Sequence, residues 1–529
     1  MSRTLRRVDI YDTTLRDGAQ MEDISFSQEE KLLVLEKLNH LGIQYVEGGW
    51  PGSNPKDMEF FKKAKRLHLQ TQLVPFGSTR RRRGSVKKDP NLKALLDVEE
   101  PVVSIVGNTW ESYGRKALRV ASETNLRMIE ETVSFLRQHG REVFFDAEHF
   151  FEGWTEQPGY TLKSLKAAMN AGASCLVLCD TNGGCLPHQI QEAIGWVRQK
   201  MPGIRLGIHC HNDSGCAVAN TLVAAQAGAT LLQGTINGYG ERTGNADLCA
   251  VMAGLEKKLG IHCIGENHLK NLKEVSHYVD ELLNMVPNSK QPYVGVSAFA
   301  HKAGMHVSAV SRSSHLYEHV DPESVGNQRR FVVSELAGKS NLAMKAREFG
   351  MDESALLRIT PHVLSSVKQL EYEGYQFEGA DASLELLFKK ALGQRKSFFE
   401  LKGFRVIVEK REDDSIQSEA TIKVKVDGRE MHTAADGDGP VNALDNALRK
   451  ALGAFYPSLS EMHLADFKVR VIDAKLGTKA KVRVIIESSD KTDTWNTVGV
   501  SQDILEASWQ ALVDGVEYKL LREESDTHA

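Results

Sequence analysis

RLGIHCH, residues 205–211, is a short apolar run that ends in polar side chains, and runs of this kind determine the predicted fold. Further runs recur along the chain at intervals of roughly 30 residues, with amphipathic helical stretches between them. They are RVDIYDTTL (7–15), YVEGGW (45–50), QTQLVPF (70–76), PVVSIVG (101–107), EVFFDAE (142–148), SCLVLCDT (174–181) and LLQGTING (231–238). Eight strands that alternate with helices over about 260 residues predict an α/β fold, a (β/α)8 TIM barrel.

The polar residues of these runs lie at or just after the carboxyl ends of the predicted strands. They are Arg16, Asp17, Glu47, Ser78, Glu148, Asp180, Thr181, Asn182, His209, His211 and Asn237. In a barrel of this type the carboxyl ends of the strands meet on one rim, where active sites are found. The pattern therefore predicts an enzyme.

Composition excludes several other classes of protein. The chain has 529 residues and a formal net charge of −4, with 41% hydrophobic and 26% charged residues. This balance argues against a disordered tail protein and against a polybasic nucleic-acid binder. No stretch approaches the ~20 apolar residues of a membrane span, and the first residues contain no apolar signal core. The seven cysteines, all between Cys175 and Cys263, indicate reduced, buried thiols, so we expect a cytoplasmic protein that binds neither nucleic acid nor a membrane.

Beyond the predicted barrel, which we place at residues 1–285, the pattern changes twice. Residues 286–400 are helical and interrupted by loops, which predicts a linker subdomain. From residue 401 the chain is rich in strands: FRVIVEK and TIKVKVDG precede the helix pattern NALDNALRKALG, and FKVRVID, AKVRVIIESS and WNTVGV precede ILEASWQALVDGVEYKLL. Because the same strand-to-helix unit occurs twice, we predict a C-terminal α+β domain with pseudo-twofold symmetry over 401–529.

His209 and His211 are two residues apart on a predicted strand. Both imidazoles therefore project to the same side of the strand, and Cys210 projects to the other. Together with Asp17, at the end of the first strand, they form a mixed nitrogen and oxygen set that suits a divalent metal with open positions for water or substrate. The alternative is a pair of hydrogen-bonded histidines that caps a strand. The position of Asp17 on the same rim favours metal binding.

Three further features of the rim each leave more than one interpretation open. Arg16 can stabilise an oxyanion that forms on a metal-bound carbonyl, or it can pair with Glu47 or Glu148 and hold the rim together. Glu148 and Asp180 can each act as a general base, orient a histidine, or serve as a structural hydrogen-bond acceptor. The glycine-rich run GTINGYGERTGNADL can cradle phosphate or only form the tight turn into the last helix.

Two clusters of basic side chains lie outside this set. Arg80–Arg83 follow the third strand and are either a solvated surface or a contact for an anionic cofactor, such as the phosphates of coenzyme A. His301, His306, His315 and His319 lie in the linker, but their spacing matches no zinc finger and no cysteine accompanies them. Individual catalytic histidines are therefore favoured over a second metal site.

Four motifs make the chain similar to a known family: YDTTLRDGAQ, HCHND, GYGERTGNADL and FAHKAGMH. In this order they resemble the DRE-TIM metallolyase family, in the acyl-CoA-condensing branch that contains the 2-isopropylmalate, homocitrate and citramalate synthases. The resemblance covers almost the whole chain, and the C-terminal repeat is similar to the regulatory domain of that branch. VEGGWPGSNPKD and DAEHFFEG are most similar to the citramalate synthases.

The resemblance implies a metal site and a residue beside it. Asp17, His209 and His211 match the ligands of a divalent metal, Mg²⁺ or Mn²⁺ with Zn²⁺ as a further candidate, and Asn245 matches an additional ligand. Arg16 matches the arginine that stabilises the enolate or alkoxide oxygen.

It also implies how the substrates are held. Glu148 matches a glutamate that contacts the 2-oxo acid and takes part in catalysis, and Thr181 matches a threonine that contacts the carboxylate of the 2-oxo acid. In this branch the linker of one subunit reaches over the barrel of its partner, where His306 and Tyr317 would help to deprotonate the acetyl methyl group. Ser308 stands where some relatives carry an acid, so that role is not transferred.

The implied reaction is a metal-assisted Claisen-type condensation of acetyl-CoA with a 2-oxo acid, followed by hydrolysis of the thioester. The similarity to the citramalate synthases favours pyruvate as the 2-oxo acid and an entry to isoleucine biosynthesis. The alternatives are a 2-isopropylmalate synthase that uses 2-oxoisovalerate and a metal-dependent hydroxyacyl-CoA lyase or aldolase. The resemblance further implies a homodimer in which residues 401–529 sense an amino acid, with isoleucine expected, between two copies.

Overall fold

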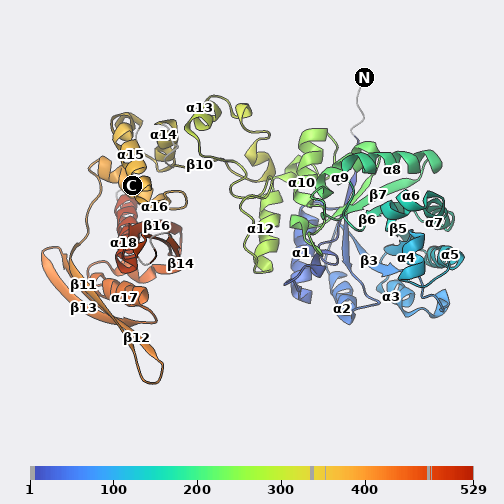
Figure 1. Cartoon of the computed structure of the whole chain (residues 1–529), viewed down its shortest axis with the longest axis horizontal. Coiled ribbons are helices and arrows are strands. Elements are labelled where there is room, and N and C mark those ends of the chain that lie inside the picture. Colours follow the sequence, from blue (N-terminus) through green and yellow to red (C-terminus); the bar gives the residue numbers. More distant parts are fainter. Residues whose placement is uncertain (1–5, 334–338, 352, 473–476, 478, 528–529) are drawn as a thin grey trace. The chain divides into compact units, whose positions relative to one another are not determined.

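The computed structural model describes residues 6–333, 339–351, 353–472, 477 and 479–527 (Figure 1). The chain divides into two units, Met1–Phe299 with His319–Arg329, and Ala300–Glu318 with Arg330–Ala529. Across the described ranges no helix combines the length and the apolar character that crossing a membrane requires.

The first unit contains a closed barrel of parallel strands, in which β1 pairs with both β2 and β8. The strands are β1 (Asp9–Asp12), β2 (Tyr45–Gly49), β3 (Gln72–Ser78), β4 (Val102–Asn108), β5 (Glu142–Glu148), β6 (Cys175–Asp180), β7 (Arg205–Cys210) and β8 (Leu231–Gly234). Each strand lies within, or within two residues of, one of the apolar runs. The predicted (β/α)8 barrel is therefore confirmed.

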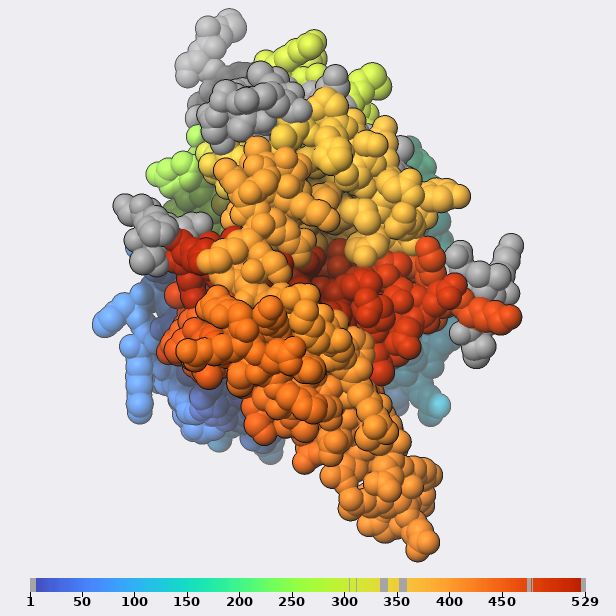
Figure 2. All heavy atoms as spheres, turned by 90° about the vertical axis from the view of Figure 1, so that its left-hand side faces the viewer, coloured from blue at the N-terminus to red at the C-terminus, as the bar shows by residue number. Residues whose placement is uncertain are grey.

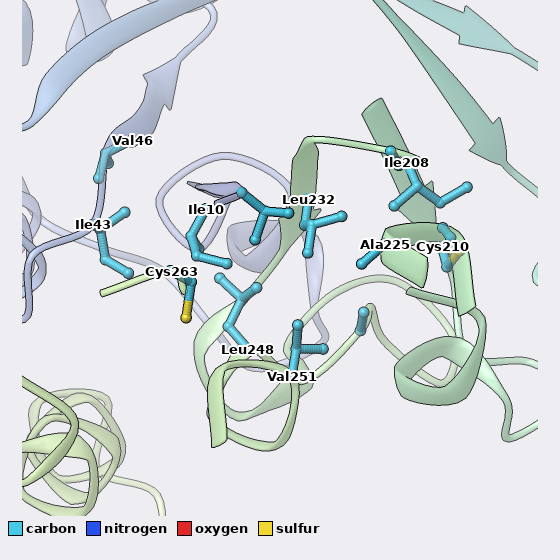
Figure 3. Close-up of a cluster of buried hydrophobic side chains, with 14 of the residues drawn as sticks. Ile10, Ile43, Val46, Ile208, Cys210, Ala225, Leu232, Leu248, Val251 and Cys263 are labelled. Atoms are coloured by element: carbon cyan, nitrogen blue, oxygen red, sulfur yellow. The ribbon is translucent and has the colours of Figure 1, made fainter. Parts of the chain in front are cut away.

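Alternation along the strands creates two apolar layers. Tyr11 and Leu231 belong to a small cluster of strand residues, whereas their neighbours Ile10 and Leu232 belong to the large cluster that also contains the helix side chains. Figure 3 shows part of the large cluster, where Ile10, Ile208, Cys210 and Leu232 of the strands lie beside Ala225, Leu248 and Val251 of the helices. The large cluster holds the helices against the outside of the barrel. The ends of the strands therefore remain available for polar side chains.

The first three helices of this unit begin at residues whose side chains cap them. Ser27 and Glu30 form a reciprocal capping box at the start of α1, and Asn54 and Asp89 cap α2 and α3, each of which has a proline in its first turn. The helices are α1 (Gln28–His40), α2 (Pro55–Ala64), α3 (Pro90–Val98), α4 (Glu111–Lys116), α5 (Ser122–Gln138), α6 (Phe150–Glu156), α7 (Pro158–Asn170), α8 (Pro187–Lys200), α9 (Ala217–Ala227), α10 (Leu248–Gly254), α11 (Glu266–Leu269) and α12 (Leu272–Leu282).

The second unit begins with helices and one small sheet. Its first elements are β9 (Ala300–His301), α13 (Gly304–Arg312), β10 (Arg330–Phe331), α14 (Lys339–Glu348), α15 (Glu353–Glu373) and α16 (Asp381–Ala391), and β9 pairs in parallel with β10. Buried apolar residues of α14, α15 and α16 pack together in one core, which also includes Val498 from a later strand.

The rest of the second unit repeats one pattern, three antiparallel strands followed by a helix. The first copy is β11 (Glu400–Lys410), β12 (Ile416–Val426), β13 (Arg429–Gly437) and α17 (Pro440–Leu452), and the second is β14 (His463–Val471), β15 (Val482–Ser489), β16 (Thr494–Ser501) and α18 (Ile504–Thr527). The predicted α+β repeat is confirmed, but β13 was missed because most of its side chains are polar or small and none is fully buried. Figure 2 shows the paler orange β11–β12 hairpin projecting beyond the darker β13 and α17.

Leu232 offers a test of how the barrel closes, because it is fully buried on β8, the strand that pairs with β1. We expect Leu232→Ala to lower the free energy of unfolding by about 2–5 kcal/mol, through lost burial and the cavity left behind. Chemical denaturation followed by the fluorescence of the barrel's tryptophans measures this loss. The matched control is Leu33→Ala on α1, where the side chain is 42% exposed; equal losses in the two variants would contradict the packing described.

Candidate active site

A cavity of about 410 Å³ lies at the carboxyl ends of the barrel strands. Its lining residues are Arg16, Asp17, Gln20, Trp50, Phe76, Ser78, Val106, Tyr113, Leu118, Asp146, Glu148, Cys179, Thr181, His209, His211, Gln233, Glu241 and Arg242. Six of the predicted site residues, from four different strand ends, are therefore brought together here: Arg16, Asp17, Glu148, Thr181, His209 and His211.

Three of these side chains converge on one point. The Nε2 atom of His209 lies 3.3 Å from Oδ2 of Asp17 and 3.3 Å from Nε2 of His211. The ligand atoms of all three residues lie within 4.8 Å of one another, and all three residues are buried. Cys210, between the two histidines, points instead into the outer apolar layer (Figure 3). The predicted alternation along β7 is what places both imidazoles in the cavity.

Hydrogen bonds behind His209 fix which of its ring nitrogens is free. Nδ1 of His209 lies 2.9 Å from Oε1 of Gln233, and the amide nitrogen of Gln233 donates to Asp146 at 3.1 Å. Ser104 donates to the other oxygen of Asp146 at 2.8 Å. Since Gln233 presents its oxygen to the ring, Nδ1 of His209 donates to it and Nε2 faces Asp17 and His211, which is the orientation of a metal-ligating histidine.

The charges around this point favour a bound cation. Burial alone would raise the pKa of Asp17, but the Arg16 guanidinium and the contact with His209 hold it well below its usual range. Burial opposes a charge on His209, but the hydrogen bond to Asp17 and the charge of Asp17 raise the pKa of this imidazole. Positive charge is therefore favoured beside the Asp17 carboxylate. Burial and the neighbouring His209 lower the pKa of His211 to about 4, which leaves this imidazole neutral near pH 7.

Asn245 lies next to this set. It pairs with His211 through an isolated antiparallel bridge, and its side-chain nitrogen donates to the carbonyl of Tyr239 at 2.9 Å. Its Oδ1 and Nδ1 of His211 are buried, and neither has a hydrogen-bond partner among the described residues. A buried acceptor without a donor is costly, so Oδ1 of Asn245, together with the Asp17 carboxylate and the Nε2 atoms of the two histidines, fits a divalent cation.

Arg16 is held in place by its neighbours. Its Nε donates to Glu47 at 2.5 Å, and its guanidinium carbon lies 4.0 Å from the centre of the Phe76 ring. The fully buried Glu47 also accepts a hydrogen bond from the Tyr11 hydroxyl at 2.7 Å. Of the two pairings expected for Arg16, the structure shows the one with Glu47. Since Arg16 also lines the cavity, it combines a structural ion pair with a face toward the cavity.

Glu148 and Thr181 line the cavity from β5 and β6. Burial raises the pKa of Glu148, although the adjacent His149 opposes this shift. The hydroxyl of Thr181 accepts a hydrogen bond from the backbone nitrogen of His149 at 2.8 Å, so its own proton is free to donate into the cavity. This bond also ties the turn after Glu148 to the end of β6.

Four of the polar strand-end residues do not line the cavity, contrary to expectation: Glu47, Asp180, Asn182 and Asn237. Asp180 is fully buried and accepts a hydrogen bond from the backbone nitrogen of Cys185 at 3.2 Å. It precedes Thr181, so strand alternation turns it away from the site. Asn237 donates to Asp280 at 2.9 Å and accepts from Ser276 at 2.6 Å, which makes it a structural residue beneath α12.

The glycine-rich run after β8 forms a tight turn into α10. A side chain at Gly244 would collide with the carbonyl of Gly238, and both residues have positive φ. The turn delivers Asn245 beside His211 and places Glu241 and Arg242 on the cavity wall. Of the two interpretations of this run, the structure therefore supports the turn.

The arginine run after β3 is only partly a solvated surface. Arg80 is buried, and its Nε donates to Glu131 at 2.5 Å. Arg81, Arg82 and Arg83 are exposed.

The linker histidines belong to the second unit, except His319. His306 stacks on Tyr317 with ring centres 4.2 Å apart, and His301 lies 3.1 Å from the buried Glu318. No second metal-ligand group was found in the described part of the chain.

Comparisons with known proteins now decide the family. The model of the HMGL-like family matches residues 7–279, the model of the homocitrate synthase post-HMGL domain matches 293–372, and that of the LeuA allosteric (dimerisation) domain matches 378–520. The chain is 53% identical to the (R)-citramalate synthase of Geobacter sulfurreducens, over 98% of each chain. It is 51% identical to that of Aquifex aeolicus, over 98% of this chain and 99% of the relative, and 49% identical to that of a Synechocystis species, over 97% and 96%. The chain belongs to the (R)-citramalate synthase family.

Several residues that line the cavity of this citramalate synthase family member were not predicted from the sequence as site residues. Asp146 is two positions before Glu148 on the same strand, and this spacing could have placed it on the same face. Burial, followed by the charge of Glu47, raises the pKa of Asp146 to about 6. Trp50, Phe76 and Leu118 are apolar, so the pattern of polar strand ends does not include them.

The converging ligands predict where a metal binds in this citramalate synthase family member. We expect Asp17→Asn, His209→Ala and His211→Ala each to weaken the binding of Mn²⁺ by about 100-fold or more. This loss is larger than that expected when a residue that only hydrogen-bonds to a ligand is removed. Isothermal titration calorimetry with Mn²⁺ measures the affinity without relying on activity. His139→Ala removes an exposed histidine at the end of α5 and serves as the control. Unchanged affinity in any two of the three variants would contradict the site.

Proposed function

We infer that this protein condenses acetyl-CoA with pyruvate and water to give (R)-citramalate and coenzyme A, an acyl transfer that feeds isoleucine biosynthesis. The observation that carries the inference is a buried carboxylate with two imidazoles beside a fixed guanidinium, in a cavity with an apolar wall. Near-complete coverage of (R)-citramalate synthases at about half identity supports the choice of reaction. A cytoplasmic location belongs to the same proposal, because all seven cysteines are free thiols.

The metal site contributes to activation of the 2-oxo acid. Mg²⁺ or Mn²⁺, with Zn²⁺ as a further candidate, would be held by Asp17, His209 and His211 with Asn245 as an additional ligand, and would polarise the ketone carbonyl. Arg16 donates to the oxygen on which negative charge develops. Its guanidinium is already fixed by Glu47, so it needs no reorganisation when the charge forms.

Thr181 and Glu148 position the 2-oxo acid from the adjacent strands. The free hydroxyl proton of Thr181 donates to the substrate carboxylate. Glu148, whose pKa is raised by burial, contacts the 2-oxo acid and takes part in catalysis as a general acid or base.

The acetyl group is activated by residues of the linker. The partner subunit's His306 and the partner subunit's Tyr317 would remove a proton from the acetyl methyl, and the resulting carbon nucleophile adds to the ketone carbon of pyruvate. Water then attacks the thioester carbonyl, coenzyme A leaves as the thiol, and a carboxylate forms. The stacking of His306 on Tyr317, which is 44% exposed, supports this role because the pair lies at a surface that a substrate can reach.

The proposed roles divide the chain into three domains. We propose a catalytic barrel of residues 1–285, a linker of 286–400 and a regulatory domain of 401–529 that dimerises and binds isoleucine between two copies. The match to the LeuA allosteric (dimerisation) domain supports a regulatory role and an oligomer.

A 2-isopropylmalate synthase is the second candidate, because one methanogen relative of that name is 29% identical over 98% of this chain. The two reactions differ in the size of the 2-oxo acid, by two methyl groups. Discrimination of this kind amounts to about 1–3 kcal/mol per methylene.

A substrate panel tests the proposed function. With acetyl-CoA and added Mn²⁺, we expect kcat/KM for pyruvate to exceed that for 2-oxoisovalerate and for 2-oxoglutarate by at least about tenfold. Release of coenzyme A, followed with a thiol reagent, measures the rate, and chelated enzyme before metal addition is the control. Preference for 2-oxoisovalerate would replace the proposal by the second candidate, and cleavage of a hydroxyacyl-CoA without condensation would replace it by a lyase.

The exposed arginines after β3 predict a contact with coenzyme A. We expect the triple variant Arg81→Ala, Arg82→Ala and Arg83→Ala to raise KM for acetyl-CoA several-fold with kcat nearly unchanged, because exposed guanidinium groups bind phosphate. Steady-state kinetics at two salt concentrations measure the effect. The control is the triple variant Lys62→Ala, Lys65→Ala and Arg66→Ala, which removes three positive charges as well. These residues lie on α2 and in the turn after it, which leads to the amino end of β3. An unchanged KM, or equal changes in both triple variants, would refute the contact.

A further inference from the structure

Trp50 is the first residue after β2, and its half-buried side chain lines the catalytic cavity. Its indole meets the Phe76 ring edge to face, with ring centres 5.2 Å apart at 84°. Phe76 in turn lies under the Arg16 guanidinium, 4.0 Å from its carbon. An aromatic wall therefore adjoins the residue that faces the reacting oxygen.

Both nitrogens of Trp50 are tied to buried groups. Its backbone nitrogen donates to Asp57 at 2.9 Å, and its indole nitrogen donates to Asn91 at 2.6 Å. Lys31 holds the other oxygen of Asp57 at 2.7 Å, and this ion pair is almost fully buried. The side-chain nitrogen of Asn91 donates to the carbonyl of Ser78 at 3.0 Å. The indole therefore cannot swing aside without breaking hydrogen bonds in a buried network.

The glycines around Trp50 make this placement possible. Gly49 has a φ of +144°, and a side chain there would collide with the Asp57 carboxylate. A Cβ at Gly52 would lie 2.8 Å from the backbone of Asn91, closer than van der Waals contact allows. The run GGWPG, residues 48–52, thus brings the indole against two fixed partners.

We propose that Trp50 determines specificity by limiting the size of the 2-oxo acid side chain to about that of a methyl group. This rests on the proposed function. The carboxylate and keto oxygen of the substrate require the polar end of the cavity, at Asp17, His209 and Arg16, so the remaining carbon group is directed toward an apolar wall. The aromatic wall adjoins Arg16 directly, and a cavity of about 410 Å³ must also admit the acetyl thioester.

The test compares 2-oxo acids on Trp50→Phe and Trp50→Leu. We expect the ratio of kcat/KM for 2-oxobutanoate or 2-oxoisovalerate to that for pyruvate to rise about tenfold or more, as space for a methylene becomes available. Both substrates are measured on one preparation, so the ratio does not depend on the fraction of folded enzyme. Trp50→Phe keeps an aromatic ring and the backbone bond to Asp57, which protects the fold. Trp196→Phe, on α8 and outside the cavity, is the matched control and should leave the ratio unchanged.

The outcomes separate this proposal from the proposed function. A wild-type enzyme that does not prefer pyruvate overturns the proposed function. A wild-type preference for pyruvate that persists unchanged in both Trp50 variants overturns only the role of Trp50. If the variants instead alter the ratio of propionyl-CoA to acetyl-CoA and leave the 2-oxo acid ratios unchanged, the indole borders the acyl group and the proposal is wrong.

Discussion

Closure of the barrel between its first and eighth strands is the constraint on which the site depends. Asp17 and the His209–His211 pair come from opposite ends of the barrel sequence, and only the pairing of β1 with β8 and of β8 with β7 makes them neighbours. The register is specific: Gln233 on β8 is opposite Tyr11 on one side and His209 on the other. Gln233 can therefore bond to His209, and a slip of one residue would turn it to the outer layer.

The buried charges of the site are arranged as a chain of compensating partners. Glu47 receives hydrogen bonds from Arg16 and Tyr11, Arg16 lies 3.6 Å from Asp17, and Asp17 lies 3.3 Å from His209. Each charge in this low-dielectric region has an opposite neighbour, which is the condition for keeping it ionised there. The cost of arranging these groups is met when the protein folds, so the guanidinium and the ligand atoms are in position before substrate arrives.

How far the sequence predicted this structure depended on the kind of signal. The barrel and the inward direction of His209 and His211 followed from periodicity, because alternation on a strand admits few other solutions. The same argument, applied to whole strand ends, wrongly included Asp180, whose direction is set by its single-residue offset from Thr181. Arg80 could not be recognised as buried, because its partner Glu131 is distant in the sequence and is brought to it only by the fold. The aromatic wall was missed for a related reason: an apolar residue that lines a cavity is indistinguishable in sequence from one that packs in a core.

The division of the proposed machinery between two units bears on regulation. His306 and Tyr317 belong to the unit that also contains the residues matched by the LeuA allosteric (dimerisation) domain, whereas the metal ligands and Arg16 belong to the barrel. Tyr317 is exposed while its neighbour Glu318 is buried against His301, so anchoring at Glu318 fixes how the His306–Tyr317 pair is presented. On the proposed function, an effector bound within the second unit would act most directly on this pair, because α13 packs on α14 and the core that contains α14 also includes Val498 of β16. On the proposed mechanism, regulation would then change deprotonation of the acetyl group and leave the barrel's binding of metal and 2-oxo acid intact.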